Sequence, residues 1–388
     1  MEALHVKMTK ERNTEHHLKN CSKTSFASST RSYDFVDVGL TEENYEELSQ
    51  KANIYVKDRF HSMSNYEFAS ERLGVCPTYD LKDLKLGHLL GKGQFGVVTE
   101  VKRGSKKNTS ELRLESAQYA IKMLDESQCN DRVSFFIGAR DLAVEAYLMT
   151  AMDHPHILKL QGLSNDPLGS KNCFLMFDRL YGTLNEYHEK WRLRQQTLSR
   201  GFRKLINSKA KQEKQRLLLE QRLQVMRDLA SAVAHLHEKY IIDRDLKPEN
   251  VGFDANGNVK LFDFGLSTEV DPSWTKPYKL TGMIGSLAYM APEVHCRLPY
   301  DETCDIYSLG LIFWKTLKLQ PLFSSMSPQM LRELVVLRGI RPVLDSTISD
   351  SMQTLLGQMW HPVPDKRISA SQVSVVLDKE LALVELAR

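Results

Sequence analysis

The chain has 388 residues, 42% of them apolar and 26% charged, a composition typical of a soluble protein with one large or two medium domains. Its net charge of +3 is too small to favour nucleic acid or a membrane as the main partner, and no apolar run approaches the ~18 residues of a membrane span. The first residues contain no apolar signal core, so secretion is not expected.

The cysteines are scattered and form no C-x-x-C pair. This pattern predicts free thiols in a reducing compartment, most of them packing residues, and therefore a cytoplasmic or nuclear protein. The six cysteines are Cys21, Cys76, Cys129, Cys173, Cys296 and Cys304.

Residues 1–34 are polar and show no hydrophobic period, which predicts disorder. An amphipathic helix is predicted over about residues 41–62, because apolar residues recur there at spacings of three and four. The helix either docks on the main domain, which is the favoured interpretation, or binds a partner. Its apolar face consists of Tyr45, Leu48, Ala52, Tyr55, Val56 and Phe60.

Residues 84–104 predict a strand, a glycine-rich turn and a second strand. Gly91, Gly93 and Gly96 form the pattern G-x-G-x-x-G, and Val98 follows two residues later. Such glycines allow a tight turn and let backbone N–H groups approach phosphate oxygens. The same pattern opens dinucleotide-binding folds, but there a helix follows directly, whereas here the chain continues as a strand.

Beyond a polar loop at residues 106–116, an apolar strand at 118–124 carries Lys122. A lone lysine in a strand usually lies at an edge or faces solvent. Glu145 lies on a predicted helix that ends before the His-Pro pair at 154–155. The shape of residues 125–139 is not predicted.

Two further strands are predicted at residues 157–160 and 173–177, and a long helix at 217–237. The stretch 191–216 is strongly basic. A solvated helical extension is the favoured interpretation, and nuclear import or an acidic docking partner are alternatives. Its basic cluster comprises Arg200, Arg203, Lys204, Lys209, Lys211, Lys214 and Arg216.

The stretch 241–265 contains the polar residues with the most informative spacing. Asp245 and Asn250 lie five residues apart, and Asp263 follows a predicted hairpin with Asn-Gly at its turn. The hairpin is expected to bring Asp263 back beside Asn250. A carboxylate and an amide together suit Mg²⁺, which keeps substrate phosphates among its ligands. Asp245 is then left free to act as a base.

These residues, D-x-x-x-x-N followed by D-F-G, resemble the catalytic and metal-binding loops of the eukaryotic protein kinases, and the resemblance extends from about Leu84 to Leu383. It implies that Asp245 accepts or orients the proton of the substrate hydroxyl and that Lys247 contacts the γ-phosphate. It also implies that Asn250 and Asp263 hold the metal ions. ATP and Mg²⁺ are the implied cofactors.

The resemblance further implies an ATP site in which Lys122 grips the α- and β-phosphates and is held by an ion pair with Glu145. Phe177 is expected at the entrance to the pocket behind the adenine, where it closes that pocket, and residues 178–180 form the hinge. The predicted ATP-binding residues are Leu90, Gly91, Lys92, Gly93, Gly96, Val98, Ala120, Lys122, Glu145, Asp178 and Leu180.

Two residues depart from the kinase pattern. Asp243 stands where the family usually has a histidine, within a column of apolar side chains (here Leu160, Met149 and Phe264), so its carboxylate needs a partner such as Arg244 or a backbone donor. Gly252 stands where a bulky apolar residue usually lies under the adenine, which predicts a looser adenine site.

Residues 266–293 correspond to the activation segment, which ends in Ala-Pro-Glu. We expect Thr281 to be a regulatory phosphorylation site that pairs with Arg244, and Ser286 to be a structural hydroxyl that bonds the catalytic loop. Its hydroxyl-bearing residues are Ser267, Thr268, Ser273, Thr275, Tyr278, Thr281 and Ser286.

Two structural contacts in the larger lobe are also implied by the resemblance. Asp305 is expected to hold the backbone of the catalytic loop. Arg367 is expected to pair with Glu293.

The predicted fold is α+β and bilobal, with a small antiparallel sheet and one helix in the N-lobe and a mainly helical C-lobe. The predicted bounds are an extension at 1–83 and a kinase domain at 84–385, divided into lobes at 84–177 and 178–385. The sequence Lys-Pro-Glu at 247–249 favours a serine/threonine kinase that acts on protein substrates and is controlled by an upstream kinase. The alternatives are a pseudokinase scaffold and, with less support, a nucleic-acid module that uses residues 200–216.

Overall fold

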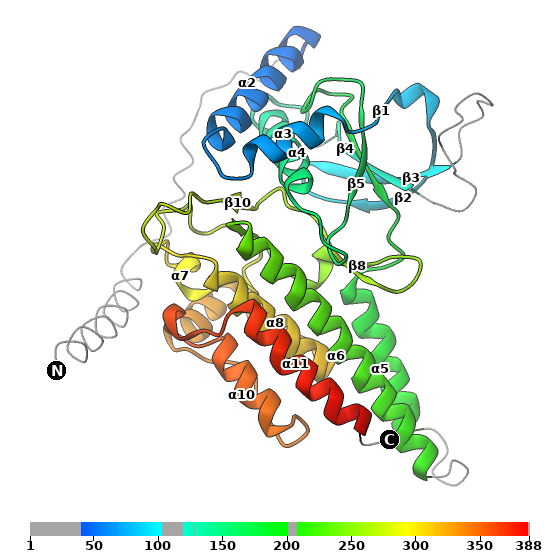
Figure 1. Ribbon diagram of the computed structural model, residues 1–388, viewed down its shortest axis with the longest axis vertical. Helices are drawn as coiled ribbons and strands as arrows, with labels where there is room; N and C mark the ends of the chain where they lie inside the picture. The colour runs from blue at the N-terminus through cyan, green and yellow to red at the C-terminus, as the bar shows by residue number, and fades with distance from the viewer. Residues whose placement is uncertain (1–39, 103–118, 128, 201–207, 387–388) are drawn as a thin grey trace, which may run out of the picture. The chain divides into compact units, whose positions relative to one another are not determined.

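A computed structural model describes residues 40–102, 119–127, 129–200 and 208–386 (Figure 1). The described residues form two compact units. The small unit runs to Tyr181 and also contains Gly252–Pro272, and the large unit contains Gly182–Val251 and the chain from Ser273 onward. The predicted disorder at 1–34, the loop at 106–116 and the basic residues Arg203 and Lys204 lie outside the described residues.

The predicted α+β class is confirmed, and the small unit contains a six-stranded sheet in the order β1-β5-β6-β4-β3-β2. Neighbouring strands are antiparallel except β1, which pairs in parallel with β5 and makes the sheet mixed rather than purely antiparallel. The strands of this unit are β1 (Thr78–Tyr79), β2 (Lys85–Lys92), β3 (Gly96–Lys102), β4 (Tyr119–Leu124), β5 (Leu160–Ser164), β6 (Phe174–Asp178), β8 (Val251–Phe253), β9 (Val259–Leu261) and β10 (Thr268–Glu269).

β1 joins the sheet through residues that were assigned to the extension. The Leu163 N–H donates to the carbonyl of Pro77 (2.9 Å), and the Asn165 N–H donates to the carbonyl of Tyr79 (2.9 Å). A Cβ on Gly162 would lie 2.5 Å from the Tyr79 ring, so only glycine permits this approach. The sheet therefore includes residues before the predicted start of the domain.

The predicted amphipathic helix is α2 (Glu42–Phe60), and it docks on the small unit as favoured. The side chains of Thr41 and Asn44 cap its first turn reciprocally. A second helix in the extension, α3 (Tyr66–Gly74), was not predicted. Figure 1 shows α2 and α3 lying beside α4 (Arg132–Ala151).

Some predicted element bounds were wrong. β5 begins at Leu160 rather than at Ile157, because Ile157 and Leu158 pair with Leu261 at the edge of the β8–β9 hairpin instead. β6 begins one residue later than predicted. α4 begins at Arg132, where the Asp131 carboxylate accepts the N–H groups of residues 133 and 134, so most of the unassigned stretch is helix.

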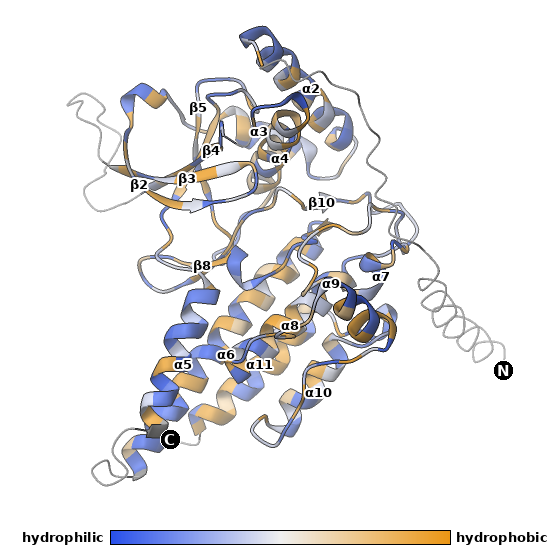
Figure 2. Cartoon of the chain, turned by 180° about the vertical axis from the view of Figure 1, so that it is seen from behind, coloured by the Kyte–Doolittle hydropathy of each residue, from blue (hydrophilic) through white to orange (hydrophobic). Residues whose placement is uncertain are grey.

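The large unit is mainly helical, and α8 forms its buried centre, coloured mostly hydrophobic in Figure 2. Its elements are α5 (Leu184–Arg200), α6 (Ser208–Glu238), β7 (Ile241–Ile242), α7 (Pro292–His295), α8 (Thr303–Lys318), α9 (Pro328–Met330), a π-helical segment (Leu331–Leu337), α10 (Asp350–Met359) and α11 (Ala370–Leu386).

The basic stretch is a helical extension where the structure describes it. α5 continues to Arg200, and α6 begins at Ser208 and runs for 31 residues, with α11 packed along it. Arg216 donates to Glu213, to Glu220 and to the carbonyl of Val384 on α11. This arginine therefore packs and pairs within the fold.

Five cysteines fall within the described residues, and all five are free thiols, as predicted. Among the described helices, none combines the length and the apolar character that crossing a bilayer requires.

Candidate active site

Lys122, Glu145 and Asp263 meet in the small unit. Lys122 Nζ lies 2.6 Å from Glu145 Oε2 and 2.8 Å from Asp263 Oδ1, so the predicted ion pair with Glu145 is present and a second carboxylate shares the ammonium. Burial opposes the charge on Lys122, but Asp263 and Glu145 outweigh it and raise the pKa of Lys122. The ammonium is therefore charged at neutral pH.

The surroundings of this cluster favour tight positioning. The Glu145 side chain is only 3% exposed, and burial raises the pKa of Glu145 although Lys122 counteracts it. Asp263 has a φ of 69°, a left-handed conformation that is uncommon for an aspartate. Charged groups with shifted pKa values that are clustered in this way mark a candidate functional site.

The glycine-rich turn lies above the strand that carries Lys122. The Gly93 N–H donates to the carbonyl of Gly96 (2.7 Å), and β3 runs antiparallel to β4 with Val98 opposite Lys122. A Cβ on Gly96 would lie 3.2 Å from the carbonyl of Met123, a close approach that favours glycine. The turn thus presents backbone groups close to the ammonium.

The remaining predicted ATP-binding residues of the small unit occupy β2, β4 and β6. Lys92 pairs with Asp125 (2.6 Å), Ala120 is buried, and Leu90 is exposed. Asp178 ends β6 and accepts a hydrogen bond from Gln161. Their roles toward a nucleotide stay predictions.

The predicted hinge is anchored at two points. Phe177 is buried, Arg179 pairs with Glu100 on β3 (2.6 Å), and the Tyr181 N–H donates to the carbonyl of Phe253 (2.8 Å). The Arg179–Glu100 pair was missed, because neither residue belongs to a recognisable motif.

The space beside Gly252 is filled by other side chains, and the looser adenine site expected there stays a prediction. A Cβ on Gly252 would lie 2.5 Å from Leu180 Cδ1 and 3.2 Å from Phe262 Cε1. The side chains of Leu180 and Phe262 therefore occupy the space that a larger residue at 252 would fill. The sequence could not show this, because the compensation comes from distant positions.

The loop at residues 243–250 is held in the large unit by Asp305 of α8, as predicted. The Asp305 carboxylate accepts the N–H groups of Asp243 and Arg244, both at 2.9 Å, and contacts His237 Nε2 at 3.0 Å. Arg244 has a φ of 71°. The Asp305 carboxylate, by accepting these two backbone N–H groups, holds the loop in this strained conformation.

Asp243 finds the backbone partner that its burial requires. It is 2% exposed, and its Oδ1 accepts the N–H of Asp245 at 3.0 Å. The departure from histidine therefore produces a carboxylate that orders the backbone of Asp245. Whether it lies in the predicted apolar column stays a prediction.

Asp245, Lys247 and Asn250 converge within this loop. Lys247 Nζ donates to Asp245 Oδ2 (2.6 Å), and Asn250 Nδ2 donates to the carbonyl of Asp245 (3.2 Å). The other carboxylate oxygen, Asp245 Oδ1, is buried and has no hydrogen-bond partner in the part of the chain that the structure describes. A buried acceptor without a partner is costly unless a ligand uses it.

The predicted metal pair of Asn250 and Asp263 stays a prediction, because Asn250 belongs to the large unit and Asp263 to the small unit.

Thr281 is exposed on the predicted activation segment. Its carbonyl accepts the hydroxyl of Tyr300 (2.8 Å), and that hydroxyl also hydrogen-bonds Arg244. A Cβ on Gly282 would lie 2.6 Å from the Cα of Arg297, so Arg297 packs directly beside this position.

The predicted activation segment also packs closely against the loop at residues 243–250. A Cβ on Gly285 would lie 2.2 Å from the carbonyl of Arg244, so the contact is made by this glycine, whose φ is 94°. The hydroxyl role expected of Ser286 stays a prediction.

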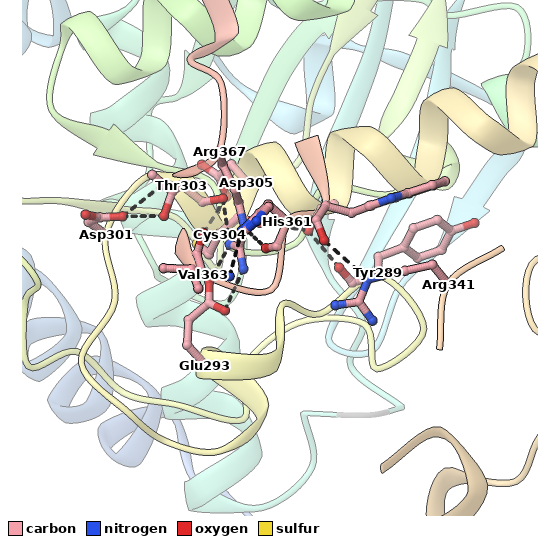
Figure 3. Close-up of polar contacts among 12 residues, drawn as sticks. Tyr289, Glu293, Asp301, Thr303, Cys304, Asp305, Arg341, His361, Val363 and Arg367 are labelled. Atoms are coloured by element: carbon pink, nitrogen blue, oxygen red, sulfur yellow. Dashed lines mark hydrogen bonds and ion pairs between the residues drawn. The ribbon is translucent and has the colours of Figure 1, made fainter. Parts of the chain in front are cut away.

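The predicted pair between Glu293 and Arg367 is present and buried (Figure 3). Arg367 Nη1 and Nη2 donate to the two Glu293 oxygens at 2.6 and 2.9 Å, a bidentate arrangement. Arg367 also donates to the carbonyls of Thr303 and His361. The pair fixes the end of the activation segment to the helical core.

The family model described as protein kinase domain matches residues 84–375. The chain is 30% identical to the mouse serine/threonine-protein kinase 33 over 299 residues, covering 74% of this chain and 52% of that protein. It is 28% identical over 327 residues to the serine/threonine-protein kinase AtPK2/AtPK19 of Arabidopsis thaliana, covering 84% and 59%. It is 26% identical over 304 residues to the human mitogen-activated protein kinase kinase kinase 7, covering 77% and 42%. The chain spans less than two thirds of each of these relatives.

Proposed function

Since the chain belongs to the protein kinase family and to its serine/threonine type, we propose that it transfers the γ-phosphate of ATP to serine and threonine hydroxyls of protein substrates. The observation that best supports catalysis is the buried Asp245 Oδ1, which has no partner within the described residues while Lys247 holds Oδ2. A carboxylate held in one orientation in this way is suited to orient or accept the proton of a substrate hydroxyl once the substrate is bound.

The residues present fit ATP and Mg²⁺. Gly96 supplies a turn that a side chain would obstruct, and Lys122 supplies a fixed positive charge beside it. Asn250 and Asp263 are the oxygen donors that would hold the metal. When bound, ATP with Mg²⁺ supplies the phosphoryl group and neutralises the charge that develops during its transfer.

The protein's own contribution is then positioning. Glu145 and Asp263 fix the Lys122 ammonium at one place, and Asp243 and Asp305 fix the backbone of the loop that carries Asp245. Because the transition state of phosphoryl transfer is loose, such positioning and charge stabilisation supply most of the rate.

A scaffold that binds nucleotide without transfer was the alternative, and it rested on Asp243 and Gly252. Both departures have structural compensation: Asp243 bonds the Asp245 N–H, and Leu180 fills the space at Gly252. Neither removes Lys122, Asp245 or Asn250. An active kinase is therefore the better-supported proposal.

The direct test is transfer of labelled phosphate from ATP to the chain itself, to a basic protein and to peptides that offer serine, threonine or tyrosine. We expect phosphoserine and phosphothreonine after hydrolysis of the products. Transfer to tyrosine alone would contradict the acceptor class. Nucleotide binding without any transfer would support the scaffold.

Gly252→Ala is expected to weaken ATP binding several-fold, because the new Cβ would displace Leu180 from the space it fills and overpacking typically costs ~1–3 kcal/mol. Binding of a fluorescent ATP analogue measures the effect. Gly357→Ala is the matched control, since a Cβ there meets nothing within 4 Å. Equal affinities of both variants would show that Leu180 does not shape the nucleotide site.

Phosphorylation of Thr281 by an upstream kinase or by the chain itself is proposed as the activating event. A phosphate there would add about two negative charges beside Arg244 and Arg297 and so order the segment. We expect Thr281→Ala to lower activity at least tenfold relative to phosphorylated wild type, a coupling of ~1.4 kcal/mol. Mass spectrometry of active protein without phosphate at Thr281 would refute this proposal.

A further inference from the structure

A buried carboxylate, Glu269, lies in the small unit shortly after Asp263. It is 1% exposed. Glu269 Oε1 accepts the backbone N–H of Asn65 (3.0 Å), the side-chain amide of Asn65 (2.8 Å) and the hydroxyl of Ser64 (3.2 Å). Glu269 Oε2 accepts the hydroxyl of Tyr147 (3.2 Å). These donors are all neutral, and they come from the α2–α3 turn and from α4.

This arrangement fixes the position of the carboxylate. Burial raises the pKa of Glu269, and the hydrogen bonds from Asn65, Ser64 and Tyr147 counteract it. A buried carboxylate is tolerated only where donors surround it, so any displacement of Asn65 removes two of the four hydrogen bonds to Glu269. The turn and the segment after Asp263 must therefore move together.

The neighbouring residue is held by the same extension. Arg59 near the end of α2 donates to the hydroxyl of Thr268, and its guanidinium lies over the rings of Tyr55 and Phe60. Two consecutive residues, Thr268 and Glu269, are thus bonded to residues 59–65. Residues 59–65 lie before the part of the chain that the kinase family model matches.

Residues of α2 also pack against α4, the helix that carries Glu145. Phe60 stacks on Tyr147, with ring centroids 4.3 Å apart, and Tyr45 meets Phe135 edge to face at 4.8 Å. Residues 145 and 147 differ by about 200° around the helix, at 3.6 residues per turn. The extension therefore supports the face of α4 opposite to the one that presents Glu145 to Lys122.

We propose that Asn65 is a positioning residue for phosphoryl transfer. Through Glu269 and Tyr147 it holds α4 and the segment after Asp263 in the arrangement in which Glu145 and Asp263 both reach Lys122. This inference rests on the proposed kinase activity. It gives the turn between α2 and α3 a role in positioning the residues around Lys122.

The test replaces Asn65 by aspartate in the full chain. Asn65→Asp is nearly isosteric but removes the amide donor and places a like charge against Glu269, so kcat is expected to fall on the order of tenfold. Glu269→Gln keeps an acceptor oxygen for Asn65 and is expected to retain most activity. The loss caused by Asn65→Asp should be smaller in the Glu269→Gln background, because the repulsion is gone.

Asn44→Asp is the matched control. Asn44 lies in the first turn of the same helix, where its side-chain oxygen accepts the Thr41 N–H, and an aspartate there keeps that acceptor. Its kcat should equal that of the wild type. Measurements are made well below the midpoint of thermal unfolding, so that a merely structural role would lower the midpoint and leave kcat unchanged.

An equal loss from Asn65→Asp in both backgrounds, or an unchanged kcat, would overturn the inference. Amide hydrogen exchange of α4 provides a readout that needs no catalysis, and Asn65→Asp should lower its protection while Glu269→Gln restores part of it. If wild type transfers no phosphate but the exchange pattern appears as expected, the proposed function fails, while the structural coupling of Asn65 to α4 through Glu269 stands. Unchanged protection of α4 would refute the positioning role itself.

Discussion

Replacing Asp245 by asparagine is expected to lower kcat by about 10²- to 10⁴-fold, the usual contribution of a positioned acid–base group. The amide keeps the size of the side chain but cannot take a proton from the acceptor hydroxyl. It also removes the carboxylate that holds Lys247. Phosphate transfer to a serine peptide at saturating ATP measures the loss.

The fold should survive this change, which makes the result interpretable. The backbone of residue 245 is held from outside its own side chain, by the bond from its N–H to Asp243 and by the contacts of Asp305 with residues 243 and 244. Nucleotide affinity should therefore change little. Asp378→Asn on α11, a 61% exposed carboxylate, is the matched control. Wild-type turnover by Asp245→Asn would remove the main support for the proposed mechanism.

Contacts between residues that belong to motifs in a fixed order along the sequence could be predicted. Lys122 with Glu145, the loop with Asp305, and Glu293 with Arg367 are each bonded as expected. These contacts were implied by the resemblance to the kinase family, which rests on the residue types and their order along the chain. The docking of α2 could also be predicted, since its apolar period leaves one face that must be covered.

Contacts between residues that belong to no motif and to no hydrophobic period could not be predicted from the sequence. Asn65 reaches Glu269 across 204 positions, and a single amide in a turn produces no period and no motif. The packing beside Gly252 could not be predicted for the same reason, since Leu180 and Phe262 fill that space from other parts of the chain. The strand bounds near Ile157 were wrong because its backbone pairs with Leu261 rather than with β6. Tertiary packing decides all three.

Arg367→Met is expected to destabilise the large unit by ~3–5 kcal/mol, the typical cost of breaking a buried ion pair. The Arg367 side chain is 0% exposed, and its removal leaves the Glu293 carboxylate buried without a cation (Figure 3). The carbonyls of Thr303 and His361 lose a donor as well. Urea unfolding followed by a probe in the large unit measures the change.

The loss of stability in Arg367→Met should arise from the unpaired Glu293 carboxylate rather than from the lost side-chain volume. A second variant separates these two causes. Glu293→Gln in the Arg367→Met background removes the unpaired carboxylate, so part of the lost stability should return. Arg338→Met breaks an exposed pair with Glu333, where both side chains are more than half exposed, and should unfold near the wild-type midpoint. If Arg367→Met behaves like Arg338→Met, the buried pair does not stabilise the end of the activation segment. A loss that Glu293→Gln fails to relieve would instead attribute the stability to the backbone carbonyls that Arg367 serves.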